Sequence, residues 1–380
     1  MTPARLLRTR QGVERVTNVE LFFDLVYVFA VTQLSRHLLG RPTVTGALQT
    51  ALLLAMVWLL WAYTAWVTNW LDPERMPVRL LLFGLLLVAL VMWAAIPESF
   101  GTRGLIIGIG YALSQIGRSV FAVVALRGRR LQQNFQRILA WCVVSGALAV
   151  AGGLASGPAR AWLWLTAVGV DLLGGLAGFY TPGLGRSQTT EWTIEGHHLA
   201  ERCQAFILIA LGESIVVIGA TLSHVLGGHV TVAEAGAFLV AVVSSVGLWW
   251  LYFDRSADEA ARVIAASADP GRMGRTAYHL IHPVMVAGII VAAAADEVMV
   301  SGPGVTGIAW KAWLVLGGTA LFIAGHAAFK IAVWRVVPWS RLAAVAVLGL
   351  LGFVAPHVSL LGLGACAAAV VIAVAALDHH

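Results

Sequence analysis

The sequence has few charged residues. Asp, Glu, Lys and Arg together make up 12% of its 380 residues, whereas a soluble domain carries about 25%. No polar stretch approaches the roughly 50 residues of the smallest domains, so we expect no separate soluble domain. The net charge of +6 comes without a basic patch interleaved with aromatic residues, and we therefore expect no binding of nucleic acid.

Cysteine is equally scarce. The three cysteines are scattered through apolar sequence, without the spacing of a metal site or a redox pair; they are Cys142, Cys203 and Cys366. This pattern predicts small buried side chains. A phosphate-binding loop after a strand, a nucleophile–base signature and a complete haem or zinc motif are also missing from the sequence. The sequence therefore predicts no cofactor and no bound metal.

The N-terminal segment lacks the pattern of a signal peptide. Residues 1–17 are rich in arginine and have neither an apolar core nor a small-residue cleavage site. We therefore expect the first apolar helix to direct the chain to the membrane.

Hydrophobic residues make up most of what is present. They account for 59% of the chain, and the mean hydropathy is +0.84. A membrane-spanning helix needs about 20 predominantly apolar residues. Stretches of that kind predict about 12 spans, at residues 18–36, 47–70, 79–97, 104–126, 137–156, 161–180, 203–223, 233–253, 277–298, 310–330, 338–354 and 357–377. The predicted fold class is all-α, a polytopic bundle of transmembrane helices.

Lysine and arginine predict the orientation of these spans, because they concentrate in loops on the cytoplasmic side. If the N-terminus lies inside, few basic residues lie outside: Arg36, Arg41, Arg103, Arg160 and Lys311. The inner side then holds most of the other basic residues, among them the cluster at 127–137. We therefore predict a multi-pass protein of the cell membrane with an even number of spans and both termini in the cytoplasm.

Short motifs recur in the two halves of the chain. Residues 23–30 match 212–219, 60–63 match 249–252, 96–98 match 295–297 and 112–121 match 320–329. Each match is weak alone, but the four occur in register. They predict two parallel six-helix repeats, an arrangement found among secondary transporters. The first half is then 1–180 and the second 197–380, with 181–196 as the linker between them.

Two acids lie near the start of the first predicted span. Glu20 and Asp24 are four residues apart and so share one face of a helix. A carboxylate in a membrane span costs about 2.5 kcal/mol or more at the bilayer centre unless it faces a bundle interior or water. Measured along their helices, Asp24 and Arg118 lie at similar depth, which predicts that they pair. The same construction pairs Glu213 with His326 in the second half.

The seventh predicted span is the most polar of the helices. Ionisable groups follow one stripe of it for much of its length: His198, Glu201, Arg202 and Glu213. In the ninth span, His282 is followed by Pro283, which kinks a helix and frees a backbone carbonyl, as in transporter helices. The pair His279 and His282 alone provides too few ligands for a metal site.

The candidate site therefore consists of buried charges and histidines from both halves: Glu20, Asp24, Arg118, His198, Glu201, Arg202, Glu213, His282 and His326. Static alternatives stay open for both predicted pairs. The pair of Asp24 and Arg118 fits an ion pair that only locks helices together. The pair of Glu213 and His326 fits either a proton relay or a fixed hydrogen bond. Asp171 fits a carboxyl group that is hydrogen-bonded to a neighbouring helix.

The sequence resembles the bacterial low temperature requirement A (LtrA) family. The resemblance is carried by Glu20-Leu-Phe-Phe-Asp24-Leu-Val-Tyr-Val-Phe, by His198-Leu-Ala-Glu201-Arg202 and by Leu211-Gly212-Glu213-Ser214. It spans most of the chain and implies a polytopic protein of the bacterial cytoplasmic membrane in which these acids are family hallmarks. The family name describes a requirement for growth in the cold and implies no particular biochemical activity.

These observations favour a proton- or cation-coupled secondary transporter that moves a small solute through a central polar site. An intramembrane enzyme acting on a lipid or isoprenoid substrate is the second reading, with a carboxylate and a histidine as acid and base. A structural membrane protein needed for growth in the cold is the third. The expected partners are membrane lipids and a small solute or ion. The sequence specifies neither that solute, nor the coupling ion, nor the oligomeric state.

Overall fold

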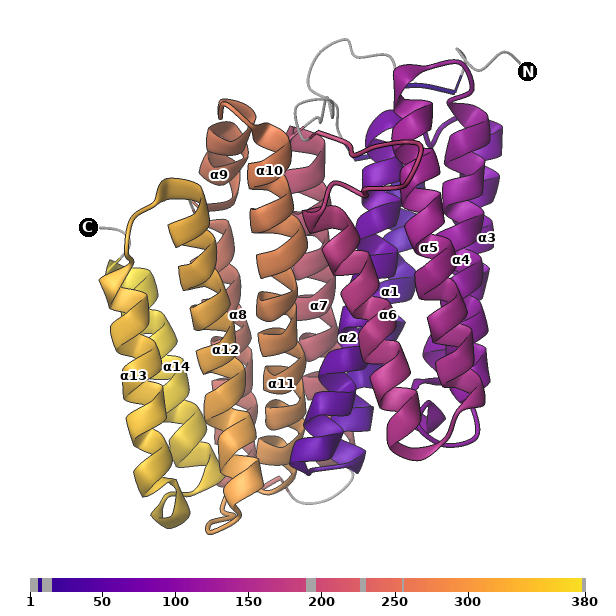
Figure 1. Ribbon diagram of the computed structural model, residues 1–380. Coiled ribbons are helices and arrows are strands. Elements are labelled where there is room, and N and C mark those ends of the chain that lie inside the picture. The colour runs from indigo at the N-terminus through magenta and orange to yellow at the C-terminus, as the bar shows by residue number, and fades with distance from the viewer. Residues whose placement is uncertain (1–5, 9–15, 189–195, 226–229, 255, 378–380) are drawn as a thin grey trace. The chain divides into compact units, whose positions relative to one another are not determined.

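The computed structural model describes residues 6–8, 16–188, 196–225, 230–254 and 256–377. Within these residues the regular structure is helical apart from isolated β-bridges. Long helices fill two compact units of the chain (Figure 1). The predicted all-α class is confirmed.

The long helices follow the predicted spans. They are α1 (Asn18–Gly40), α2 (Val44–Trp70), α3 (Met76–Ala94), α4 (Gly104–Ala125), α5 (Arg130–Leu154), α6 (Gly157–Leu176), α7 (Gly196–Val225), α8 (Val232–Phe253), α11 (His282–Ser301), α12 (Ala309–Trp334), α13 (Trp339–Val354) and α14 (Leu360–Leu377). Most ends lie within a few residues of the prediction, whereas α5 and α7 begin about two turns earlier.

Among the described residues, 11 helices are long and apolar enough to cross a membrane. The exception among the long helices is α6, in which Arg160 and Asp171 interrupt the apolar sequence. Its 20 residues still correspond to about 30 Å of helix, which is the thickness of the hydrocarbon core. The structure is thus consistent with about 12 spans. The orientation of the termini and the two six-helix repeats stay predictions.

The first compact unit comprises Met1–His37, Leu48–Arg202 and Ser267–Arg272. Within it, α4 and α5 approach each other closely at glycine residues. A Cβ atom on Gly108 would lie 2.4 Å from the carbonyl oxygen of Ala149, and one on Gly153 would lie 2.9 Å from that of Gly104. Small residues at such contacts let transmembrane helices pack backbone to backbone.

A short N-terminal segment is fastened to the end of α2 within the same unit. Leu7 and Leu71 form an isolated antiparallel bridge, and the backbone N–H of Arg8 donates to the carbonyl oxygen of Trp70 at 3.0 Å. The segment therefore holds the side chain of Arg8 beside the membrane helices.

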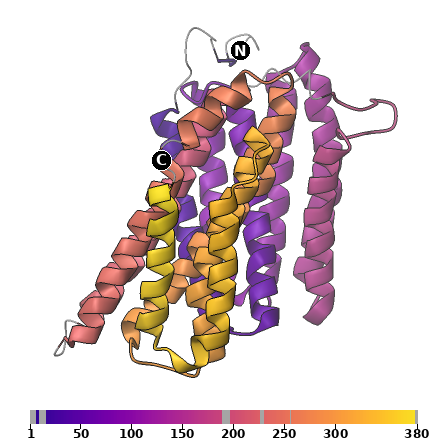
Figure 2. The same cartoon turned by 90° about the vertical axis from the view of Figure 1, so that its left-hand side faces the viewer.

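The second compact unit comprises Leu38–Ala47, Cys203–Ala266 and Met273–His380. Here α11 and α12 are the close pair, since a Cβ on Gly288 would lie 2.5 Å from the backbone nitrogen of Phe322. A Cβ on Gly318 would likewise lie 2.5 Å from the nitrogen of Ala292. Figure 1 and Figure 2 both show α13 and α14, the yellow helices, side by side.

Three short elements between α8 and α11 lie largely outside the predicted spans: α9 (Ser256–Ala265), α10 (Pro270–Gly274) and a π-helical turn, η4 (Arg275–Ile281). Helix α9 is amphipathic, with Ala260 and Ile264 buried and Glu259 exposed. The π-helical turn leads directly to Pro283 near the start of α11. Proline has no N–H to donate, and a widened turn accommodates that loss. Close to Pro283, where the sequence predicts a kink, the helix changes from a π-helix to an α-helix.

The cysteines divide into two environments. Cys142 and Cys203 are buried, as predicted, whereas Cys366 is exposed on α14. The prediction for Cys366 is wrong because lipid-facing positions of a membrane helix are as apolar as buried ones, so apolar neighbours do not separate the two.

Candidate functional site

Glu20 both starts helix α1 and contributes a buried charge. Its backbone N–H donates to Thr17 Oγ1 at 3.3 Å, while the backbone N and Oγ1 of Thr17 both lie 3.0 Å from Glu20 Oε2. This reciprocal pair of bonds is a capping box. The sequence pattern Thr-x-x-Glu at 17–20 indicates this capping box, although it is not among the motifs that predicted the site. Glu20 and Asp24 are fully buried.

Arg202 of α7 joins both acids. Its Nη2 lies 2.6 Å from Asp24 Oδ1 and its Nε 3.1 Å from Asp24 Oδ2, while Nη1 lies 2.9 Å from Glu20 Oε1. The two bonds to Asp24 form the planar fork that makes arginine–carboxylate pairs strong. Trp61 Nε1 donates to Asp24 Oδ1 at 2.8 Å, and Arg202 Nη1 also reaches Thr68 Oγ1 at 3.2 Å. One guanidinium thus connects α1, α2 and α7.

His198, one turn before Arg202, also contacts Glu20. Its Nε2 lies 2.9 Å from Glu20 Oε1, and its Nδ1 lies 3.2 Å from the amide nitrogen of Asn69. Nε2 also lies 3.0 Å from Nη2 of Arg8. His198 thus contacts Glu20, Asn69 and Arg8 through its two ring nitrogens.

Arg8 approaches Glu20 from the N-terminal segment. Its Nη2 lies 2.8 Å from Glu20 Oε2, and its Nε donates to the carbonyl oxygen of Thr68 at 2.7 Å. The side chain of Arg8 is 8% exposed. Arg8 therefore supplies part of the positive charge around Glu20. It lies outside every predicted span and is not among the predicted site residues.

We call Arg8, Glu20, Asp24, His198 and Arg202 the α1–α7 network. Its two carboxylates face two guanidinium groups, so these four buried charges balance. Buried charges are tolerated in apolar surroundings when they are paired and hydrogen-bonded. This balance explains how the first span carries two acids.

Glu201, the neighbouring predicted site residue, lies at the edge of this network. Its Oε2 accepts from the backbone N–H of Val16 at 2.9 Å, and its Oε1 lies 4.0 Å from Nδ1 of His197. Its side chain is 27% exposed. Glu201 therefore holds the chain just before α1 instead of joining the buried charges.

The predicted pairing of Asp24 with Arg118 is wrong. Arg118 donates instead to the carbonyl oxygen of Leu60 at 3.3 Å and to Thr64 Oγ1 at 3.4 Å, and it lies 5.2 Å from the ring centre of Tyr63. Equal depth in the membrane allows a contact but does not fix the direction in which a helix presents a side chain. Arg202 occupies the face that Asp24 points toward.

Arg118 belongs to a second buried cluster, which contains Asp171 of α6. Tyr111 Oη and Gln115 Nε2 donate to Asp171 Oδ2 at 2.5 Å and 2.7 Å. Gln115 also accepts from Arg118 through Oε1. The amide of Gln115 thus bridges the carboxyl group and the guanidinium. The prediction that Asp171 bonds to a neighbouring helix is confirmed.

In the second unit, His326 bonds to Arg341 and not to Glu213, so the predicted pairing is wrong there too. Nε of Arg341 donates to His326 Nδ1 at 3.3 Å. Since a guanidinium only donates, the proton of this histidine lies on Nε2. Depth along the helices does not predict which neighbour faces His326, and α13 supplies that neighbour, Arg341. Glu213 is buried on the part of α7 that belongs to this unit.

His282 and His326 lie in one aromatic cluster. His282 Nε2 accepts from Tyr252 Oη at 2.7 Å, and its Nδ1 lies 3.1 Å from the carbonyl oxygen of Ala277 in the π-helical turn. The ring of Phe329 lies 5.2 Å from that of His282 and 6.5 Å from that of His326. The structure therefore brings together two predicted site residues from α11 and α12.

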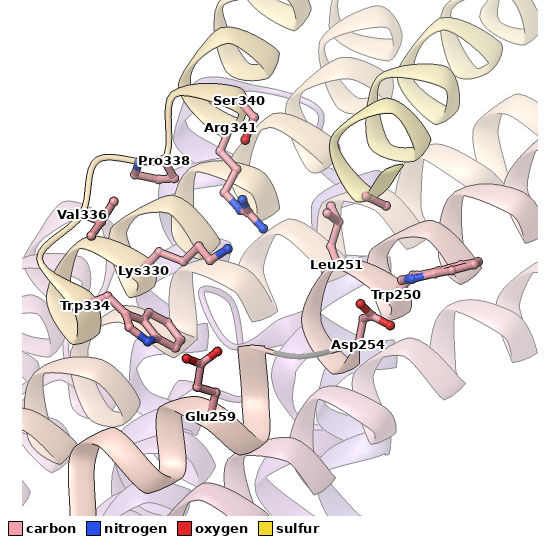
Figure 3. A pocket seen from close by; sticks show the side chains of 11 residues that line it. Trp250, Leu251, Asp254, Glu259, Lys330, Trp334, Val336, Pro338, Ser340 and Arg341 are labelled. Carbon is pink, nitrogen blue, oxygen red and sulfur yellow. The ribbon is translucent and has the colours of Figure 1, made fainter. Parts of the chain in front are cut away.

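An open pocket of about 460 Å³ lies near this cluster, at the end of α8 and α12. Figure 3 shows Lys330 and Arg341 on one side of it and Asp254 and Glu259 on the other. Its walls include Trp250 and Trp334. The volume falls in the range of small-molecule sites, about 300–1,000 Å³. The pocket presents both signs of charge, and Arg341 connects it to His326.

Comparison with known proteins identifies the family. The family model for the bacterial low temperature requirement A protein (LtrA) matches residues 15–376. The chain belongs to the LtrA family. The uncharacterized protein RA0937 of Rhizobium meliloti strain 1021 is 33% identical to this LtrA protein over 362 residues, which are 95% of this chain and 88% of that protein. No solved structure matches the chain.

The matched region contains four members of the α1–α7 network, while Arg8 precedes it. The LtrA family and the 11 apolar helices together show a multi-pass protein of the cell membrane. The resemblance and the localisation expected from the sequence are therefore confirmed.

Proposed function

We propose that this LtrA protein is a secondary transporter that couples the movement of a small solute to that of a proton or another cation. The observation that carries the proposal is the α1–α7 network, which places a balanced set of acids and bases inside membrane helices. Ionisable groups in membrane spans are rare, and they commonly mark pathways for ions and solutes.

The network provides a way to change conformation. Neutralising Asp24 or Glu20 leaves Arg202 with positive charge that its surroundings no longer balance. A state in which water or an anionic group reaches Arg202 then becomes more favourable. A ligand or proton can shift a conformational equilibrium only through such a difference between two states.

The pocket in the second unit supports a solute that carries both signs of charge, such as an amino acid. Lys330 and Arg341 suit a carboxylate, and Asp254 and Glu259 suit an ammonium group. Trp250 and Trp334 add apolar surface for the remainder of the solute. Small-molecule sites combine a few placed polar groups with apolar walls in this manner.

Reconstituted vesicles test the proposal. The purified protein is placed in vesicles that contain a pH-sensitive dye, and labelled amino acids are supplied under an imposed pH gradient or an imposed Na⁺ gradient. We expect gradient-dependent uptake that Asp24→Asn abolishes. Asp72→Asn is the matched control, because Asp72 pairs with Arg75 in an exposed loop.

The proposal is wrong if neither protons, Na⁺ nor any labelled solute crosses the vesicle membrane faster than in empty vesicles. It is also wrong if Asp24→Asn transports like the wild type. Size-exclusion chromatography of each variant before reconstitution separates a loss of transport from a loss of folding.

A further inference from the structure

A small cavity lies within the second unit, apart from the groups discussed above. It has a volume of about 20 Å³ and lies among α7, α8, α11, α12 and α14. A cavity needs roughly 10–15 Å³ to hold one water molecule. The cavity therefore admits one particle of that size and not a hydrated ion.

Asp296 of α11 is the acid of this cavity. It is 7% exposed, and it forms no hydrogen bond or ion pair within the described parts of the chain. Buried polar groups in native proteins almost always have a partner, and a bare buried carboxylate is costly. We therefore expect this carboxylate to have a bound partner that is not a protein side chain.

Hydroxyl groups surround the same space. Ser214, Ser244, Ser245 and Thr319 all line the cavity. Ser214 is 2% exposed, and its Oγ has no hydrogen-bond partner within the described residues. Four helices thus direct oxygen atoms, and no nitrogen or sulfur ligand of the histidine or cysteine type, toward one small volume.

This donor set has a clear chemical preference. Carboxylate and hydroxyl oxygens suit hard cations. A magnesium ion usually keeps several water molecules, which this volume does not accommodate. A single carboxylate also balances a single positive charge. The size and the charge together favour a monovalent ion.

We propose that Asp296 and the hydroxyl groups of Ser214, Ser245 and Thr319 bind one dehydrated sodium ion. Ser244 also lines the cavity, and the other wall residues are apolar, among them Leu248 and Val315. The protein oxygens take the place of the hydration shell of the ion. This site lies outside the α1–α7 network, and the inference does not rest on the transport function proposed above.

Thermal unfolding of the purified full-length protein in detergent tests the site. NaCl replaces choline chloride stepwise at constant ionic strength. An ion that binds only the folded state stabilises it in proportion to the logarithm of its concentration above the dissociation constant. We expect the midpoint of unfolding to rise with Na⁺ by several degrees, and to rise less with K⁺.

Variants locate the effect. Asp296→Asn removes the charge, and we expect it to abolish the response to Na⁺. Thr319→Val keeps the shape of the side chain and removes one oxygen, so we expect the half-saturating Na⁺ concentration to rise about tenfold. Glu297→Gln makes the same change in charge at the next residue, which does not line the cavity, and we expect it to respond like the wild type.

Three outcomes overturn the inference. In one, the wild type responds equally to NaCl and choline chloride. In another, Asp296→Asn retains the Na⁺ response. In the third, the stability of the wild type depends on pH and not on Na⁺, which would indicate a protonated carboxyl group. If Asp296→Asn does not fold, equilibrium dialysis of ²²Na⁺ against the wild type and Thr319→Val gives the same decision. Binding without transport would refute the proposed function and leave this inference intact.

Discussion

The fork between Arg202 and Asp24 shows how a single residue can join three membrane helices. Two nitrogen atoms of Arg202 bond to Asp24 and a third contact reaches Glu20, all within fully buried surroundings. A lysine at this position has one ammonium group and no planar fork. The contacts of the guanidinium therefore explain why arginine suits this position.

Neutralising one partner of this pair is expected to destabilise the protein. Asp24→Asn leaves Arg202 with incomplete compensation, and breaking a buried pair typically costs about 3–5 kcal/mol. The measurement is the free energy of unfolding in mild detergent. Arg75→Ala is the control, because Arg75 is 51% exposed and exposed pairs contribute about 0–1 kcal/mol.

The double variant Asp24→Asn with Arg202→Gln separates structure from function. If the charges only lock the helices, the double variant recovers most of the stability that Asp24→Asn loses. We expect such recovery of stability without recovery of transport. Recovery of both would show that this pair only locks the helices and that transport does not depend on its charges.

The sequence located the buried acids but not all of their partners. Glu20 and Asp24 are conspicuous because they are charges in an apolar span. The sequence predicts Arg202 as part of an ionisable stripe, whereas depth along the helices alone predicts Arg118 as the partner of Asp24. Side-chain direction depends on how each helix is rotated about its axis, and that rotation is set by packing against several neighbours at once.

At the scale of the element, Arg160 fastens the end of α5. Its guanidinium donates to the carbonyl oxygens of Gly152, Ala155, Ser99 and Gly101 at 2.6–3.2 Å. The last carbonyl groups of a helix have no partner within the helix, and a cation near them is favourable. One side chain thus joins the end of α5 to the loop before α4.

Replacing Arg160 is expected to lower the stability of this end of the first unit. Arg160→Lys cannot reach all of these carbonyl groups, and a hydrogen bond to a charged group contributes about 1.5–3 kcal/mol. We expect a lower midpoint of thermal unfolding for Arg160→Lys. Arg103→Ala is the control, because Arg103 is exposed and its guanidinium donates to one carbonyl group, that of Ala94. Equal midpoints for the two variants would contradict this role.

The contact between α11 and α12 gives a second prediction for an element. Gly318→Ala places a Cβ 2.5 Å from the backbone of Ala292, whereas a Cβ on Gly317 meets nothing within 4 Å. Overpacking of this kind costs about 1–3 kcal/mol. We therefore expect Gly318→Ala to be destabilising and Gly317→Ala to be neutral or slightly stabilising, as measured by unfolding in detergent. The opposite order would show that the two helices separate easily.

Hydropathy predicts the end of a helix where apolar sequence changes sharply to polar sequence. It does not predict the end where the helix continues beyond the apolar span into polar sequence. The start of α5 at Arg130 and that of α7 at Gly196 lie in polar sequence, so a search for apolar residues begins these helices too late. The search for apolar spans does not predict helix α9, because its apolar face consists mainly of alanine. The π-helical turn has no pattern of its own beyond the proline that follows it.

For the whole molecule, the predicted topology depends on whether α6 crosses the membrane. Single cysteines are introduced at Arg129, Ser156 and Arg186, which all lie in exposed loops, after the three native cysteines are replaced. An impermeant thiol reagent is then applied to intact cells. We expect Ser156→Cys to be labelled from outside, and Arg129→Cys and Arg186→Cys only after the cells are opened. Labelling of Ser156→Cys and Arg186→Cys from the same side would contradict the crossing and the even number of spans.

At this scale the sequence predicts an all-helical membrane protein because composition alone decides that class. The relation between the two halves is a different matter, since short motifs in apolar sequence recur by chance. Each compact unit nevertheless contains its own buried ionisable groups, around Arg202 in one and around His282 and His326 in the other.

The order in which the ribosome makes the chain gives the α1–α7 network a consequence for biosynthesis. Arg202 follows Asp24 by 178 residues, and it is therefore synthesised roughly 9 to 36 seconds later at about 5–20 residues per second. Arg8, in contrast, is made before Glu20 and is available at once. Until α7 is synthesised, Arg8 is the arginine of the network that is available to pair with Glu20. A ribosome stalled before residue 196 would therefore leave Asp24 of α1 without Arg202.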